Sequence, residues 1–247
     1  MERNLYFETE NLTDIAVRLA WAQMEVFADD VEKIQVLVAG DEGSVNDLRI
    51  LVRDNALVVE QPQYGLSLNL MESRWMQACV RVPKTWRQGI HLNTISGLLS
   101  ARGLFGGSIV LDSISGDIHA TRITAEDMAF KTISGDIRAE KLAVGSLAAR
   151  SVSGAHRMED VELDTLRCNS VSGEQTYHLS KAFSQIDVGA VAGNVTITAP
   201  IREVNLSMRS ISGRGRTEGL ETTENPNAPK VRVTGVSADV TLMSVQK

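Results

Sequence analysis

The sequence predicts an all-β fold, a parallel β-solenoid (β-helix) of about eight coils with roughly 19–20 residues per coil, capped by an amino-terminal β-rich region. Three observations lead to this prediction. A short motif of the form Ser/Thr-Ile/Val-Ser-Gly recurs along the chain. Apolar and polar residues alternate with a period of two around each copy, which is typical of strands with one buried face. Glycine and β-branched residues crowd the motif, which disfavours a solenoid built from helices.

The spacing of the motif indicates the length of one coil. The residue before the glycine position falls at 96, 115, 134, 153, 172, 192, 212 and 237, so the steps are 19, 19, 19, 19, 20, 20 and 25. We interpret the motif as architectural, because glycine permits a sharp bend and hydroxyl groups can bond the amides of that bend. Its residues are Ser96, Gly97, Ser115, Gly116, Ser134, Gly135, Ser153, Gly154, Ser172, Gly173, Gly193, Ser212 and Gly213.

Alignment of the copies produces columns of apolar residues. We expect three columns to share one interior, at six, four and one residues before the motif serine. The first column begins with Ile90, Ile109 and Met128, and the second begins with Leu92, Leu111 and Phe130. The third column is Ile95, Ile114, Ile133, Val152, Val171, Val191, Ile211 and Val236. After the glycine we expect Ile118, Ala120, Ile137 and Ala139 to point inward and His119, Arg138, Arg157, Thr176, Thr196 and Arg216 to point outward. Because one coil buries too few side chains to fold alone, the coils must stack.

The first 89 residues differ from the rest. They contain all three tryptophans and carry 9 basic against 14 acidic residues. Alternating apolar residues predict strands near 15–21, 34–38, 66–70 and 80–82, and a short helix is expected around Asn46–Arg53. We therefore divide the chain into an amino-terminal β-rich cap with irregular first coils at 1–89 and a regular solenoid at 90–247, since the open end of a solenoid needs covering.

The carboxyl-terminal end has no obvious cap. Lys230–Leu242 reads as an apolar strand pair that follows a polar, proline-containing loop at 219–230. We expect this pair to form an exposed edge that recruits a second copy. The candidate self-association residues are Val231, Val233, Val240 and Leu242.

The repeated strings SISGD, TISGDIRAEKL and SVSG, together with VRVPKTWRQGIHLNTISG at 80–97, resemble the bacterial putative-adhesin family over roughly residues 20–247. The resemblance implies a parallel β-solenoid domain of unknown function with an envelope or binding role. It supplies no catalytic residue to transfer to this chain.

Few residues suggest a metal or a cofactor. Asp117, Asp136 and Glu174 share the column after the glycine and are weak metal candidates, because stacked turn carboxylates more often accept local amide bonds. The histidines, at 91, 119, 156 and 178, fall in different columns, whereas zinc needs converging ligands. We expect no cofactor and no resident metal.

Composition and charge narrow the function. Net charge −6 makes nucleic acid an unsuitable partner, and no apolar run approaches the roughly 18 residues of a membrane span. Two cysteines and an amino end without signal-peptide features favour a cytoplasmic location. We expect a non-enzymatic interaction or structural scaffold whose partners are proteins, including further copies of itself. The alternative is a glycan-binding or polysaccharide-cleaving β-helix protein, with the loop at 219–230 as its place for an active site.

Overall fold

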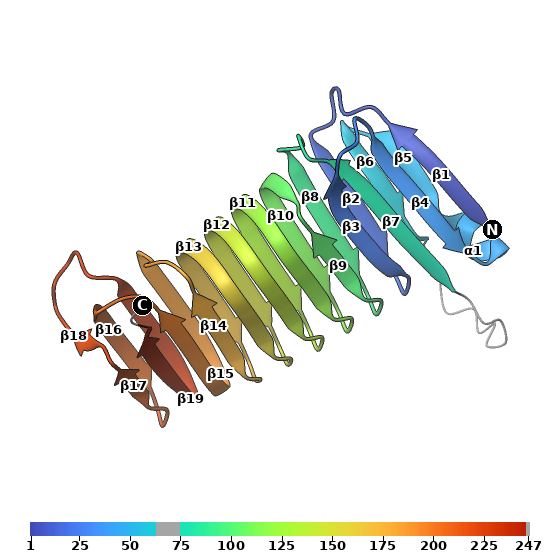
Figure 1. Cartoon of the computed structure of the whole chain (residues 1–247). Coiled ribbons are helices and arrows are strands. Elements are labelled where there is room, and N and C mark those ends of the chain that lie inside the picture. The colour runs from blue at the N-terminus through green and yellow to red at the C-terminus, as the bar shows by residue number, and fades with distance from the viewer. Residues whose placement is uncertain (63–74, 246–247) are drawn as a thin grey trace.

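The structure, a computed structural model, describes residues 1–62 and 75–245. Within these ranges there are 19 strands and one short helix, and the strands are hydrogen-bonded into one long sheet. Figure 1 shows the strands lying across the long axis of an elongated body. The predicted all-β, solenoid-like class is therefore confirmed. No helix in the described ranges is long and apolar enough to span a bilayer.

Corresponding residues of neighbouring repeats are paired side by side in the centre of the molecule. The strands there are β8 (Gly89–Thr94), β9 (Leu99–Arg102), β10 (Phe105–Ser113), β11 (Ile118–Thr132), β12 (Ile137–Ser151), β13 (His156–Ser170), β14 (Gln175–Leu179) and β15 (Gln185–Ala199). The pairing is parallel, and β11 meets β12 with Ile118 opposite Ile137. The same residue of β12 lies opposite His156 of β13, again 19 positions later. Each repeat thus extends the hydrogen-bonded ladder of the one before it.

The interior is built from the columns six and four residues before the motif serine, and from the alternation after the glycine. Ile109, Leu111, Ile118 and Ile137 are completely buried. One hydrophobic cluster joins the first 89 residues to the later repeats, so the core continues across the boundary predicted at 89. The boundary at residue 89 therefore marks a change in the sequence and not a break in the core.

The third expected interior column is wrong. The residues one before the motif serine are exposed, by 39–50% in seven repeats and by 83% at Ile211. The alternation explains this result, because positions six, four and two before the serine face the same way. Position two holds buried hydroxyl residues such as Thr94 and Thr132, whose Oγ1 atoms accept hydrogen bonds from Gly97 N at 3.1 Å and Gly135 N at 2.9 Å. The aliphatic residue between position two and the serine must then point outward.

At the amino-terminal end, the order of strands in space differs from their order in the chain. The strands are β1 (Glu2–Phe7), β2 (Asp14–Leu19), β3 (Gln23–Asp29), β4 (Ile34–Gly40), β5 (Arg49–Arg53), β6 (Ala56–Glu60) and β7 (Met76–Pro83). β2 lies between β6 and β8, and β3 lies between β7 and β9. β4 pairs antiparallel with β1 on one side and with β7 on the other, and this ends the parallel stacking.

The helix expected at Asn46–Arg53 is misplaced. α1 (Glu42–Asp47) begins earlier, where Asp41 Oδ1 accepts a hydrogen bond from Ser44 N. Residues 49–53 form β5, because Asp54 and Asn55 both have positive φ (51° and 60°) and turn the chain into an antiparallel hairpin with β6. The strand expected at 66–70 lies outside the described residues.

The carboxyl-terminal strand is not an edge. β19 (Lys230–Ser244) lies between β15 on one side and β16 (Glu203–Ser210) with β17 (Gly215–Glu218) on the other. Val231, Val233, Val240 and Leu242 are at most 3% exposed, so the predicted self-association edge is wrong. The chain passes through β18 (Glu221–Thr222) and returns to insert its last strand inside the stack, where apolar residues are buried by strands on both sides. The outer edge is β16 with β17, whose exposed residues are mostly polar.

Candidate interaction surface

The outward column forms a single row along one side of the repeats, which we call the aliphatic ridge. Because β19 is inserted between β15 and β16, Val236 precedes Ile211 in space. In spatial order the ridge consists of Ile95, Ile114, Ile133, Val152, Val171, Val191, Val236 and Ile211. The sequence contains the signal for the ridge. With a strict period of two, the residue one before the motif serine points away from the interior that the two buried columns share.

The motif serines hold the ridge in place. Ser115 N and Ser115 Oγ both donate to the carbonyl oxygen of Ile95, at 2.7 and 3.0 Å. The same pair of bonds joins Ser172 to Val152, at 2.9 and 3.3 Å. Each of these serines therefore links its own bend to the bend of the previous repeat.

The glycines allow the bends to approach closely. A Cβ built on Gly116 would lie 2.1 Å from the carbonyl oxygen of Gly97, and one on Gly135 would lie 2.1 Å from that of Gly116. Such separations are too short for any side chain, so the glycines are needed for backbone contact between repeats.

The carboxylates proposed as metal ligands have local partners. Asp117 Oδ1 accepts from Asp136 N, and Asp136 Oδ1 accepts from Ala155 N, both at 2.9 Å. Arg138 is 3.2 Å from Asp136 and 3.7 Å from Asp117. The structure thus links the two aspartates through Asp136 N, and Glu174, one repeat beyond Ala155, lines the same hollow as Asp136 and Arg138. No cluster of three metal-binding side chains is present in the described ranges.

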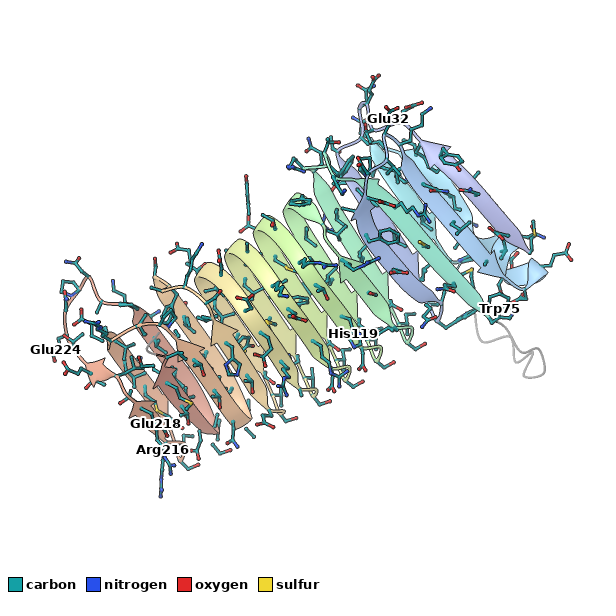
Figure 2. All side chains as sticks on the ribbon, in the orientation of Figure 1. Glu32, Trp75, His119, Arg216, Glu218 and Glu224 are labelled. Atoms are coloured by element: carbon teal, nitrogen blue, oxygen red, sulfur yellow. The ribbon has the colours of Figure 1, made fainter. Side chains whose placement is uncertain are left out.

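The outward faces carry ion pairs. Arg157 pairs with Glu159, two residues further along the same strand, at 3.1 Å. Arg138 instead binds the aspartates of the bend, and Glu140 lies 3.5 Å from Lys141. Figure 2 shows Arg216 and Glu218 at the carboxyl-terminal end. These exposed pairs balance charge on the sheet and add little stability each.

A buried polar cluster lies inside the stack. His156 Nδ1 is 3.1 Å from the Tyr177 hydroxyl, which donates to Cys168 Sγ at 2.9 Å, and Cys168 also contacts Gln175. Burial lowers the pKa of His156 to about 4 and raises the pKa of Cys168 to about 12. The imidazole is therefore neutral and the thiol protonated, and a protonated thiol is a poor nucleophile.

This cluster was missed in the sequence. His156 and Gln175 occupy the inward column that holds Ile118 and Ile137 in other repeats, so the column alignment contained the signal. His156 Nε2 and Gln175 Nε2 have no hydrogen-bond partner in the described ranges. The cluster is enclosed in the core and presents no group to a substrate.

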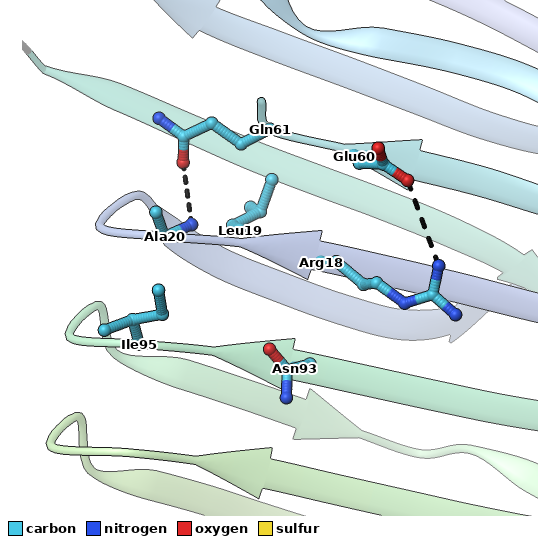
Figure 3. Close-up of a pocket in the computed structure, with 7 residues that line it drawn as sticks. All are labelled: Arg18, Leu19, Ala20, Glu60, Gln61, Asn93 and Ile95. Carbon is cyan, nitrogen blue, oxygen red and sulfur yellow. Dashed lines mark hydrogen bonds and ion pairs between the residues drawn. The ribbon is translucent and has the colours of Figure 1, made fainter. Parts of the chain in front are cut away.

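A shallow hollow of about 260 Å³ adjoins the first residue of the ridge (Figure 3). There Gln61 Oε1 accepts from Ala20 N at 2.8 Å, and Arg18 lies 3.9 Å from Glu60. Its lining residues are Arg18, Leu19, Ala20, Glu60, Gln61, Asn93 and Ile95. The hollow therefore lies between Arg18 and Glu60 on the sheet face and Ile95, the first residue of the ridge.

Comparison with known proteins identifies relatives of the whole chain. The family model described as Toastrack DUF4097 matches residues 12–243. A structure described as a putative adhesin from Parabacteroides merdae is 9% identical with TM-score 0.64, covering 100% of this chain and 96% of its own. A putative adhesin from Parabacteroides distasonis is 10% identical with TM-score 0.61, covering 99% and 97%. A structure described as a putative lipid binding protein from the same species is 12% identical with TM-score 0.60, covering 100% and 96%. No curated protein matches the sequence.

Proposed function

The chain belongs to the Toastrack DUF4097 family, and from this premise we propose that it is a non-enzymatic, adhesin-like scaffold that binds other macromolecules through the aliphatic ridge. The resemblance to putative adhesins that the repeated motif indicated is confirmed. The solved structures share the fold at 9–12% identity, so the role of this chain rests on its own surface.

The observation that carries the proposal is the exposure of the ridge. Eight aliphatic side chains stand in one row, seven of them 39–50% exposed. A contiguous exposed apolar surface is unusual on a soluble protein and is typical of interaction sites. The sheet faces beside it carry paired charges such as Arg157 with Glu159, which do not favour a ligand of either sign.

Three finer features belong to the same proposal. We take the parallel 19- and 20-residue register to represent about eight coils of a solenoid, which presents its ridge as one straight surface. Proteins are the proposed partners, and the cytoplasm is the proposed location. One structural neighbour is described as lipid binding and others as adhesins, so lipid remains a competing ligand class in the tests below.

Site-specific photo-crosslinking in the native cell tests the proposal. A photoreactive residue at Val152 on the ridge is expected to yield protein adducts, whereas one at Thr176 on the neighbouring sheet face is not. Equal adducts at the two sites would contradict a ridge-mediated function.

The glycan alternative has a separate test. The purified chain is expected to leave a panel of polysaccharides uncleaved. Cleavage that disappears when residues 219–230 are deleted would show that the protein is an enzyme and overturn the scaffold proposal.

A further inference from the structure

The aliphatic ridge has no covering segment among the residues that the structure describes. Its seven half-buried side chains and the more exposed Ile211 follow one another from repeat to repeat. Neighbouring strands in a sheet are about 4.8 Å apart, so the eight side chains form a row roughly 34 Å long. Backbone hydrogen bonds between successive bends keep each ridge residue beside its counterpart in the next repeat.

The side chains of the ridge are all aliphatic, and the bends that carry them are uncharged. The four-residue bends that carry it, from 94–97 to 235–238, contain no charged residue in any of the eight repeats. Seven of the eight ridge carbonyl groups already accept hydrogen bonds, as at Val191, which accepts from Ser237 Oγ at 3.2 Å, and Val236, which accepts from Ser212 Oγ at 3.2 Å. A charged or strongly polar ligand would therefore find few partners along the ridge itself.

We propose that the occupant of the ridge is the ridge of a second copy of this chain, an inference that rests on the proposed scaffold function. A second copy has the same 4.8 Å spacing, so each aliphatic side chain can sit between two side chains of the facing row along the whole length. Identical ladders form dry, interdigitated contacts of this kind. A partner helix has a pitch of about 5.4 Å and would drift by about 4 Å over seven repeats.

The area of the ridge predicts a weak, reversible dimer. A fully exposed Val or Ile side chain has roughly 60–120 Å² of apolar area, so eight half-exposed side chains offer roughly 240–480 Å² per copy. With the flanking serines this remains below the approximately 800 Å² per partner of a standard stable interface. We therefore expect a weak association that appears only as the protein concentration rises.

Sedimentation velocity across a range of protein concentrations tests the inference. The wild-type chain is expected to shift from monomer to dimer as concentration rises. The variant Ile114→Thr/Ile133→Thr/Val152→Thr/Val171→Thr keeps β-branched residues in the ladder but removes apolar surface, and should weaken dimerisation about tenfold or more. The control Thr176→Ala/Thr196→Ala, on an outward sheet face, should dimerise like wild type.

Cysteine cross-linking tests the geometry of the dimer. Val152 lies near the middle of the ridge, so Val152→Cys in a Cys79→Ala background should form a disulfide-linked dimer for either relative direction of the two ridges. Cys168 is buried and should not react. Thr196→Cys in the same background is the control and should remain monomeric. Preserved melting temperatures for all variants exclude unfolding as the cause of any difference.

The outcomes separate this inference from the scaffold proposal. A protein that is monomeric at every concentration, or a dimer that the threonine variant leaves unchanged, would overturn the inference. Ridge-dependent binding to phosphatidylcholine vesicles by a monomer would overturn it in favour of lipid. If photo-crosslinks at Val152 join other proteins but never a second copy, the scaffold proposal holds and self-docking fails.

Discussion

At the scale of the single residue, the cluster of His156, Cys168 and Tyr177 is an unusual feature of the core. These side chains are at most 1% exposed and bond mainly to one another. Burial raises the pKa of Tyr177 and of Cys168 and lowers the pKa of His156, so all three stay neutral near pH 7. A neutral imidazole in the core makes folding sensitive to acid.

We predict that stability decreases as the pH falls from about 6.5 to about 4. In this window the unfolded chain protonates His156, with an ordinary pKa of 6.5, while the folded chain, with a pKa of about 4, does not. Because only the unfolded chain takes up this proton, the free energy of unfolding should be about 3 kcal/mol lower at pH 4 than at pH 6.5.

Urea unfolding across this pH range checks the prediction. His156→Leu should flatten the part of the pH dependence that belongs to this residue, whereas Ile137→Leu, a substitution without a titratable group in the same inward column, should not. An identical pH profile for wild type and His156→Leu would contradict the assignment.

A second residue-scale prediction concerns the bend glycines. Gly116→Ala should destabilise the fold by roughly 1–3 kcal/mol, since its Cβ would lie 2.1 Å from the Gly97 carbonyl oxygen and the backbone of two repeats must move. Gly107→Ala is the matched control, because its nearest contact is Arg87 O at 3.5 Å. Chemical denaturation compares the two variants, and equal losses would show that close approach is not the reason for glycine.

At the scale of the element, the inserted strand β19 has a role different from that of an edge. It pairs with β15 along most of its length and with β16 and β17 on its other side. Each of its inward residues is therefore covered by the repeat before and the repeat after it. The exposed edge is formed by β16 and β17. Arg209 in β16, Arg216 in β17 and Arg214 in the bend between them discourage the addition of further strands.

We predict that Val233→Asp destabilises the protein by about 3 kcal/mol or more, because an unpaired carboxylate would replace a side chain that is 0% exposed. The control Ser207→Asp places the same charge at an exposed position of β16 and should have little effect. Urea unfolding measures both. If Val233→Asp is tolerated as well as the control, β19 is not an inner strand in solution.

At the scale of the whole molecule, stability is shared between neighbouring repeats. Contacts run almost wholly between adjacent rows, and one core cluster extends from Leu12 to Leu242. In such an array, an inner repeat is supported on two sides and a terminal repeat on one. The two ends differ, since antiparallel strands and α1 complete the amino-terminal end.

Hydrogen exchange is expected to reveal this arrangement. Backbone amides of β11, β12 and β13 should be the best protected, and those of β16 and β17 should exchange first, because the outer edge opens without disturbing the inner repeats. Mass spectrometry of peptides from these strands measures the difference. Uniform protection along the chain would instead indicate one fully cooperative unit.

The fold class and most of the core could be predicted from the sequence because their signals are local. The 19-residue step places Ile118, Ile137 and His156 in one column, and the structure pairs those residues. The alternation also identified inward residues such as Leu111 and outward ones such as Arg157. The error at Ile114 and its counterparts came from grouping residues by apolarity, although the same alternation assigns them to the outer side.

The sequence by itself determined that the chain is a stack of similar β repeats with a glycine bend in each, since period and composition act over a few residues. Only the tertiary structure decided where the strands at the two ends are placed. A strand such as β19 has the same apolar alternation at an edge or between two neighbours, so its partners depend on which distant backbone groups remain unpaired. Placing β19 inside the stack buried the predicted self-association residues and left the aliphatic ridge as the exposed apolar surface.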